Sequence, residues 1–329
     1  MRLKNKKVLV TGGGGFIGSH LLEELVKKSC KVKAFVHYNS KASCGNIAFL
    51  SKKIMGEIEI CYGDLRELDT LTKVMRGVDV VFNLAALVGI PYSYIHPHEV
   101  VMTNMIGTLN ALTAARDCHI QKFIQTSTSE VYGSPDSVPI RETAALKPQS
   151  PYSASKIGSD AIALSFFYSF AFPVAVIRPF NAFGPRQSAR AVIPTIISQA
   201  LAGDCIKLGS LSPIRDFTYV TDIAEGFIKI AESQRSVGEV INIGSGRGIS
   251  IGETAELVGK IIGKKLKISE DSQRVRPENS EVIRLKADNS KAKKLLGWQP
   301  QMSLRQGLSR TIDFIKENQW FYNPSQYAV

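Results

Sequence analysis

Thr11-Gly12-Gly13-Gly14-Gly15-Phe16-Ile17-Gly18 lies between an apolar stretch at 7–10 and a stretch of helical periodicity at 19–28. A strand, a glycine-rich turn and a helix in this order form the fingerprint of a dinucleotide-binding unit. In that unit Gly12 makes the tight turn, Gly15 lets the backbone approach a pyrophosphate, and Gly18 lets the helix pack closely on the sheet. The N-terminus of the helix then supplies backbone donors and a favourable dipole for the anion.

Short apolar strands alternate with helical stretches along most of the chain. We expect strands at 7–10, 31–36, 57–62, 79–84, 122–126, 174–177 and 239–244. This alternation predicts an α/β fold, a Rossmann-type doubly wound parallel sheet of about seven strands with a smaller mixed C-terminal lobe. We assign 1–180 with 215–245 to the dinucleotide-binding domain, and 181–214 with 246–329 to a substrate-binding lobe.

The composition excludes several classes of protein. The chain has 329 residues, of which 44% are hydrophobic and 21% charged, enough for a large core. Its net charge is +12, but the lysines are scattered, so we expect an anionic small molecule and no nucleic acid. The run 161–177 is interrupted by polar residues and proline, so we expect no membrane span and no secretory signal.

The cysteines and histidines do not form a metal-binding pattern. Five scattered cysteines without a CxxC motif fit reduced thiols, and we expect a cytoplasmic protein. His96 and His98 flank a proline, but no partner of suitable spacing accompanies them, so we expect no metal site.

The end of the second strand bears on the choice of cofactor. An acidic residue there would bind the adenosine ribose of NAD, but the segment reads His37-Tyr38-Asn39-Ser40-Lys41. Without that carboxylate, a 2′-phosphate is not repelled, and Ser40 and Lys41 can receive it. Asn39 can still bond a ribose hydroxyl, so both NAD and NADP remain candidates.

The ends of the later strands supply further candidate contacts. Asp64 is placed either to bond an adenine amino group or to cap a helix, and small residues after the fourth strand leave room for a cofactor. The predicted cofactor-binding residues are Gly12, Gly15, Phe16, Ile17, His37, Asn39, Ser40, Asp64, Leu65, Leu84, Ala85, Ala86, Asn104, Tyr152 and Lys156.

A polar cluster and a Tyr-Lys pair provide the candidate chemistry. Tyr152 and Lys156 are four residues apart and so share one face of a helix. A nearby ammonium favours the phenolate, which lowers the pKa of the tyrosine and makes it a general base. Such a pair alone is typical of an ordinary helix surface, and the cluster alone of a polar strand end. Together they predict a catalytic set of Thr128, Ser129, Glu130, Tyr152 and Lys156.

Two arginine-bearing loops suit a diphosphate, because the planar guanidinium pairs with phosphate oxygens in a bidentate manner. One follows the sixth strand, and the other is Arg215-Asp216-Phe217. The predicted substrate-binding residues are Ser93, Asn181, Arg186, Arg190, Arg215 and Arg276.

Together these motifs resemble those of the extended short-chain dehydrogenase/reductases that act on nucleotide sugars, over nearly the whole chain. The segments 152–156, 179–194 and 276–293 look like those of the 4,6-dehydratases of legionaminic acid biosynthesis, which act on GDP- or UDP-linked N-acetylglucosamine. The resemblance implies tightly bound NAD(P)+ that is regenerated at each turnover. It also implies a homodimer that buries helices 104–117 and 153–170 in a four-helix bundle.

The resemblance further implies roles for the catalytic set. Tyr152, held as phenolate by Lys156 and assisted by Thr128, takes the proton of the sugar 4-hydroxyl while C4 is oxidised. Glu130 then removes the C5 proton, water leaves from C6, and the hydride returns to C6.

One position departs from this pattern. Many 4,6-dehydratases have an aspartic acid where this chain has Ser129, and a hydroxyl is a far poorer general acid. Either Glu130 serves both as base and as acid, or the protein is a UDP-glucuronate decarboxylase or a 4-epimerase on the same scaffold. A dinucleotide-binding protein without catalysis is the third alternative, against which the intact Tyr152 and Lys156 argue.

Overall fold

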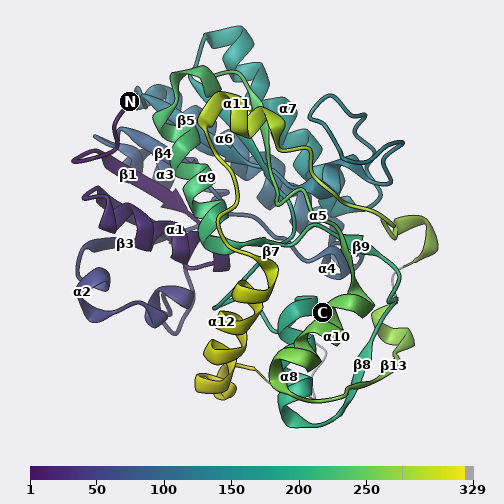
Figure 1. The fold of residues 1–329 in the computed structure, drawn as a ribbon. Coiled ribbons are helices and arrows are strands. Elements are labelled where there is room, and N and C mark those ends of the chain that lie inside the picture. Colours follow the sequence, from purple (N-terminus) through teal and green to yellow (C-terminus); the bar gives the residue numbers. More distant parts are fainter. Residues whose placement is uncertain (276, 323–329) are drawn as a thin grey trace.

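A seven-stranded parallel sheet runs through the computed structural model, which describes residues 1–275 and 277–322 (Figure 1). Its order is β11-β6-β5-β4-β1-β2-β3. The chain order reverses between β1 and β4, and ligands of such sheets bind at the carboxyl ends of the strands beside this point. The strands are β1 (Lys7–Thr11), β2 (Lys31–His37), β3 (Ile58–Gly63), β4 (Val80–Asn83), β5 (Lys122–Thr126), β6 (Val174–Pro179) and β11 (Val240–Ile243). The predicted fold class is confirmed.

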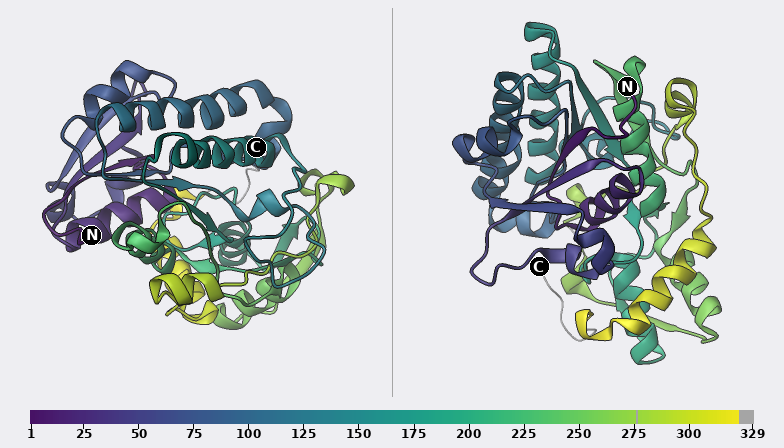
Figure 2. Two further views of the ribbon diagram at one scale, coloured as in Figure 1. Left: turned by 90° about the horizontal axis from the view of Figure 1, so that it is seen from above. Right: turned by 90° about the vertical axis from the view of Figure 1, so that its left-hand side faces the viewer.

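Helices cover both faces of the sheet, as Figure 2 shows. Successive strand residues point to opposite faces, so Val8 and Val10 pack on one helical layer and Leu9 on the other. The first layer holds α1 (Phe16–Lys27), α9 (Val220–Glu232) and α11 (Ser290–Leu296). The second holds α3 (Leu68–Met75), α6 (Gly107–Asp117) and α7 (Pro151–Phe170). Burial on both faces explains why these strands are continuously apolar.

A smaller lobe with its own apolar core lies beside the carboxyl ends of the strands (Figure 1). Its core joins α8 (Val192–Ala202), α10 (Ile251–Ile262) and α12 (Leu304–Glu317) to the parallel pair β8 (Cys205–Leu208) and β13 (Lys267–Glu270). Short elements complete the fold: η1 (Gly45–Phe49), α2 (Lys52–Met55), α4 (Ile90–Ile95), η3 (Ser129–Tyr132), β7 (Ala182–Phe183), β9 (Ile214–Arg215), β10 (Thr218–Tyr219), η4 (Gln234–Ser236), β12 (Ile249–Ser250), η5 (Ser272–Arg274), η6 (Glu278–Ser280) and η7 (Gln319–Phe321).

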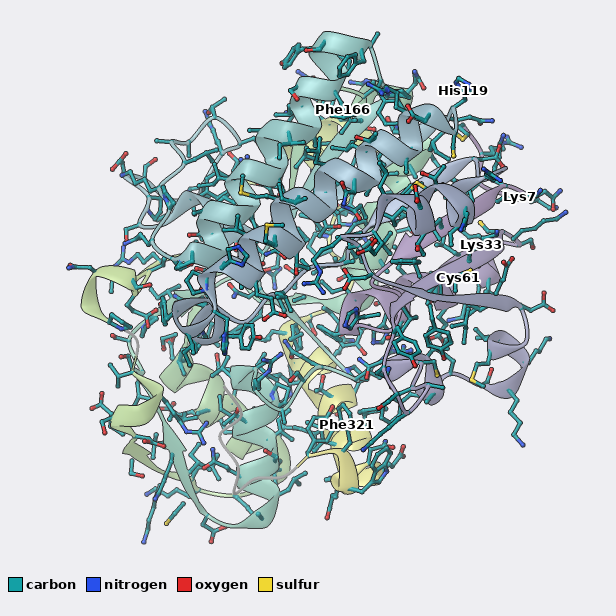
Figure 3. The ribbon with its side chains drawn as sticks, turned by 180° about the vertical axis from the view of Figure 1, so that it is seen from behind. Lys7, Lys33, Cys61, His119, Phe166 and Phe321 are labelled. Carbon is teal, nitrogen blue, oxygen red and sulfur yellow. The ribbon has the colours of Figure 1, made fainter. Side chains whose placement is uncertain are left out.

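An aromatic cluster joins the end of the described chain to the region after β2. The ring of Phe49 lies 5.4 Å from that of Phe314, 5.8 Å from Trp320 and 5.2 Å from Phe321, measured between centroids. Figure 3 labels Phe321 beside α12, and Cys61 on the edge strand β3. The smaller lobe is therefore also packed against the segment that follows β2.

The helix expected at 104–117 begins earlier in the structure. It starts as α5 (Pro97–Val101), passes through a π-helical turn, η2 (Met102–Ile106), and continues as α6. Proline suits the first position of a helix, because the missing N–H has no partner there.

In 1–275 and 277–322, no helix is both long and apolar enough to cross a membrane. Over the same residues, His, Cys, Asp and Glu side chains form no group of three that could hold a metal ion.

The glycine turn leaves no room for a side chain at Gly18. A Cβ there would lie 2.2 Å from the carbonyl oxygen of Gly12. We predict that Gly18→Ala lowers the free energy of unfolding by about 1–3 kcal/mol, the usual cost of overpacking, and weakens binding of the dinucleotide. Thermal unfolding with and without NAD+ measures both effects. The control is Gly203→Ala, because a Cβ at Gly203 meets no atom within 4 Å. Equal stability of the two variants would contradict the prediction.

Candidate active site

A cleft of about 890 Å³ lies at the carboxyl ends of the sheet strands and is walled by both lobes. The glycine turn lines one part of the cleft, and Thr128 and Tyr152 line another. Residues of the smaller lobe form the far wall. Of the predicted site residues, those that line this cleft are Gly12, Gly15, Phe16, Ile17, His37, Asn39, Leu84, Ala85, Ala86, Thr128, Ser129, Glu130, Tyr152, Lys156, Asn181, Arg190 and Arg215.

The glycine end fits the pyrophosphate of a dinucleotide. Gly12 has a φ of 69°, and a Cβ on it would lie 2.8 Å from the backbone nitrogen of Ala85. Gly15 stands at the N-cap of α1, where no side chain accepts from the first backbone N–H groups. These N–H groups therefore face the cleft without a protein cap, as an anion at a helix N-terminus requires.

The loop after β2 uses its polar atoms internally. The Asn39 Oδ1 accepts from the backbone N–H groups of Lys41 (3.2 Å) and Ser43 (3.0 Å), and its Nδ2 donates to the Ser43 carbonyl (3.0 Å). Ser40 is exposed and lies outside the cleft lining. Asn39 thus lines the cleft with its amide bonded to its own loop, and the binding of the cofactor by Asn39 and Ser40 stays a prediction.

Two further predicted cofactor residues lie outside the cleft lining. The Asp64 carboxylate pairs with Arg66, at 2.9 Å from its Nε and 2.5 Å from its Nη2. Leu65 is buried between the sheet and α6, close to Gly107. The adjacent arginine and the apolar core thus take these side chains away from the cofactor cleft.

Asn104 is also withdrawn from the cleft, because its amide is buried and fully bonded. Its Oδ1 accepts from the Leu87 backbone N–H (2.8 Å), and its Nδ2 donates to the Leu87 carbonyl (3.0 Å) and to the Ser155 Oγ (2.9 Å). It lies in the π-helical turn, a distortion that is frequent at functional sites. Its bonds hold the segment after β4 against α7, so it positions the cleft wall and does not line it.

The sequence around Tyr152 explains why a helix starts there. Ser150 is the N-cap of α7, and it forms a capping box with Ser153, while Pro151 occupies the first turn. The four-residue spacing then brings Tyr152 and Lys156 to one face, toward the segment that follows β5. Thr128 caps η3 by accepting from the Glu130 backbone N–H at 3.2 Å.

The electrostatics of Tyr152 differ from the sequence-based expectation. Burial raises the pKa of Tyr152 well above its ordinary value, and the charges of Glu130 and Asp160 raise it further. A hydrogen bond with Thr128 acts in the opposite direction. The direction of this pKa shift is opposite to the predicted lowering by Lys156, because removal of the phenol from water is its largest cause.

Lys156 is affected by the same burial. Desolvation lowers its pKa to about 8, and the charge of Asp160 acts in the opposite direction. In the free protein, the lysine therefore loses its charge as the pH rises through about 8.

The predicted substrate residues divide into two groups. Asn181, Arg190 and Arg215 line the cleft, and Arg215 Nη2 also pairs with the Glu281 Oε1 at 2.7 Å. Ser93 does not line it, because its hydroxyl is buried and donates to the Ile90 carbonyl at 2.7 Å. Arg276 lies outside the described residues.

Arg186 points away from the cleft and into the interface between the lobes. Its Nη2 lies 2.8 Å from the Glu23 Oε2 and 2.6 Å from the His20 Nδ1. Burial lowers the pKa of His20 to about 3, so this imidazole is neutral and tolerates the guanidinium. Arg186 therefore lies outside the cleft lining, where a carboxylate of α1 holds its side chain, and its role in binding the substrate stays a prediction.

Several lining residues escaped the sequence analysis. Arg274 and Glu281 line the cleft from the smaller lobe, together with Leu208, Gly209 and Ser210. The signal for Arg274 was its place among the basic loops of the C-terminal third, close to Arg276. Glu281 carried no signal, since its position depends on its ion pair with Arg215.

The glycine turn and the predicted catalytic residues Thr128, Ser129, Glu130, Tyr152 and Lys156 thus line one cleft. Residues 9–311 match the profile of the GDP-mannose 4,6 dehydratase family. The chain thus belongs to this family, within the NAD-dependent epimerase and dehydratase branch of the short-chain dehydrogenase/reductases.

Similar proteins include both epimerases and dehydratases. An "uncharacterized UDP-glucose epimerase YtcB" of Bacillus subtilis is 32% identical over 94% of this chain and 98% of its own. The dTDP-glucose 4,6-dehydratase DesIV of Streptomyces venezuelae, solved with NAD and TYD bound, superposes with a TM-score of 0.85 at 28% identity, covering 97% and 100% of the two chains. A UDP-N-acetylglucosamine 4-epimerase of Methanobrevibacter ruminantium, in complex with UDP-N-acetylmuramic acid, has a TM-score of 0.87 at 31% identity, covering 95% and 99%.

The hydrogen bond between Thr128 and Tyr152 yields a pH-dependent prediction. Because this bond lowers the pKa of Tyr152, Thr128→Val raises it, and a higher pH is then needed to form the phenolate. We expect the acid limb of the kcat/KM profile to move to higher pH, with a loss of about tenfold to a hundredfold at neutral pH. The control Thr128→Ser keeps the hydroxyl and retains the wild-type limb. An unmoved limb in Thr128→Val contradicts the role.

Proposed function

We propose that the protein is a nucleotide-sugar 4,6-dehydratase that converts GDP- or UDP-linked N-acetylglucosamine to the 4-keto-6-deoxy sugar, as in legionaminic acid biosynthesis. The observation that carries the proposal is the place of Glu130. Its carboxylate lines the same cleft as Tyr152 and Thr128, and lies close enough for its charge to raise the pKa of Tyr152. Oxidation at C4 alone needs no such carboxylate, whereas removal of a C5 proton does.

Each residue of the set has a separate task. Tyr152 accepts the proton of the C4 hydroxyl, with Thr128 as its hydrogen-bond partner. Bound NAD(P)+ supplies the hydride acceptor, and the same hydride later returns to C6, so no external reductant is consumed. Once C4 is a ketone the C5 proton is acidic; Glu130 removes it, and water leaves from C6.

Protonation of the leaving hydroxide is assigned to Glu130. Ser129, in the position of the usual aspartic acid, is buried and lines the cleft, but its hydroxyl is a poor acid. After Glu130 has accepted the C5 proton it is itself a carboxylic acid, and it delivers that proton to the C6 oxygen. When the hydride returns to C6, C5 takes up one proton, which balances the proton that Tyr152 accepted from the C4 hydroxyl, so the net change is the loss of one water.

The second candidate is a 4-epimerase or a UDP-glucuronate decarboxylase. It is favoured by Ser129 and by the epimerases among the similar proteins. Both activities share the C4 oxidation with the dehydratase and differ from it only in the fate of the 4-keto sugar.

The product mass separates these activities. We expect purified protein incubated with GDP- or UDP-N-acetylglucosamine to yield a product lighter by about 18 mass units, the mass of one water. A loss of about 44 units from UDP-glucuronate indicates decarboxylation instead. An unchanged mass with an altered sugar in the NMR spectrum indicates epimerisation, and either result rejects the dehydratase.

Two variants test the assigned roles. We predict that Tyr152→Phe abolishes C4 oxidation, because the proton acceptor is lost. Glu130→Gln should oxidise C4 and then stall, so that reduced cofactor accumulates and absorbs near 340 nm. Wild-type dehydration by Glu130→Gln would place the base elsewhere.

The cofactor and its domain remain part of the proposal. We assign NAD(P)+, retained through turnover, to 1–180 with 215–245, and the nucleotide sugar to 181–214 with 246–329. The loop after β2 has no carboxylate and carries Lys41, whereas the similar DesIV was solved with NAD bound, so NAD and NADP are both candidates. Titration of the protein with each cofactor, followed by the quenching of tryptophan fluorescence, gives both dissociation constants.

The assembly is proposed as a cytoplasmic homodimer. Large apolar side chains are exposed along α6 and α7, with Leu109 37%, Phe170 53% and Tyr168 76% accessible. Pairing of α6 and α7 with those of a second copy covers them. Light scattering should give twice the mass of the chain, about 72 kDa against a chain of 36.0 kDa.

A further inference from the structure

Behind the catalytic residues lies a buried carboxylate with one free oxygen. Asp160 is on α7, four residues after Lys156 and eight after Tyr152, and so shares their face. Its Oδ2 accepts from the Ser127 Oγ (2.7 Å) and from the Nε (3.1 Å) and Nη2 (3.0 Å) of Arg178. Its Oδ1 is buried without a hydrogen-bond partner.

Arg178 extends this contact to the far end of η3. Its Nη1 donates to the Tyr132 hydroxyl at 2.9 Å, and that hydroxyl donates to the Asn242 Oδ1 at 2.8 Å. The guanidinium carbon also lies 5.0 Å from the centre of the Tyr132 ring. Ser127 and Tyr132 lie on either side of Thr128 and Glu130 in the sequence. Ser127 bonds Asp160 and Tyr132 bonds Arg178, so both contact the same ion pair.

We propose that Asp160 and Arg178 are positioning residues for the oxidation at C4: their ion pair holds α7 in register with 127–132, so that Tyr152 and Lys156 face Thr128. The inference goes beyond the proposed function, because it rests on the C4 oxidation common to epimerases and dehydratases. It holds whether the product is a dehydrated or an epimerised sugar.

A purely stabilising role explains the pair less well. Burying two charges costs nearly as much as their attraction returns, so a buried ion pair is weak evidence for stability. This pair instead spans α7, the segment after β5, and β6, and its position coincides with the catalytic set. An unpartnered Oδ1 is also unfavourable in a group that serves only to stabilise the fold.

The charges that face the pair lead to a distinctive pH signature. Those on α7 are Tyr152 and Lys156, and Asp160 raises the pKa of both. From η3, the groups are Glu130, which also raises the pKa of Tyr152, and Tyr132, which bonds Arg178. Loss of the Asp160 charge therefore lowers both pKa values at once, and both limbs of the pH–rate profile move to lower pH.

The test is Asp160→Asn, which keeps the shape and removes the charge. It is measured in the full-length protein on the sugar nucleotide that the wild type turns over. We expect kcat to fall by about tenfold or more, the effect of a small misplacement of reacting groups, and KM to change by less than about threefold. Both limbs of the kcat profile should shift to lower pH. A folded Asp160→Asn with wild-type kcat and unmoved limbs overturns the proposal.

Two further variants separate position from stability. Asp222→Asn is the matched control, since Asp222 is a buried carboxylate that accepts from the backbone N–H groups of Gln301 and Met302. It should lower thermal stability without moving the pH limbs, and a shift equal to that of Asp160→Asn overturns the proposal. If Asp160→Asn fails to fold, the double variant Asp160→Asn/Arg178→Gln removes both charges, and we expect it to fold but to have reduced activity. Full activity of the double variant would also overturn the proposal. Wild-type protein inactive on every sugar nucleotide tested would count against the proposed function instead.

Discussion

The ion pair between Asp160 and Arg178 joins the two elements on which the site depends. The carboxyl ends of parallel strands lie at one edge of the sheet. That arrangement alone does not fix how far a helix packed on the sheet is shifted along its axis relative to the strand ends. Here a single buried carboxylate accepts from a strand-end arginine and from the serine that precedes Thr128. This contact also fixes the position of Tyr152, which lies about two helical turns before Asp160 on α7.

Burial sets the chemistry of the cleft as much as the residue types do. In water, a lysine beside a tyrosine favours the phenolate, and that expectation led the sequence analysis. In the folded protein, Tyr152 is 7% exposed, and the loss of solvent is the largest cause of its raised pKa. The hydroxyl of Thr128 opposes that rise through a hydrogen bond.

The sequence predicted the sheet well because both faces of each strand are buried, so that every strand appears as an apolar run. It also predicted Thr128, Tyr152 and Lys156 at one cleft, since strand ends and helical spacing are local properties. It did not reveal the partners that several polar side chains have within the protein. Arg186 pairs with Glu23, Asp64 with Arg66, and Asn104 with the backbone of Leu87. Those pairings depend on contacts between residues distant in sequence or on local turns that spacing does not reveal.

Arg186 has a consequence for how the two ligands affect each other. Its guanidinium contacts His20 and Glu23 of the helix that starts at the glycine turn, and its carbonyl accepts from the Asn46 side chain at 2.9 Å. The next two residues, Gln187 and Ser188, line the far wall of the cleft. Whatever orders the start of α1 thus orders part of that wall too. Linkage is reciprocal, so if a dinucleotide at the glycine turn changes the affinity of this wall for a second ligand, that ligand changes the affinity for the dinucleotide by the same factor.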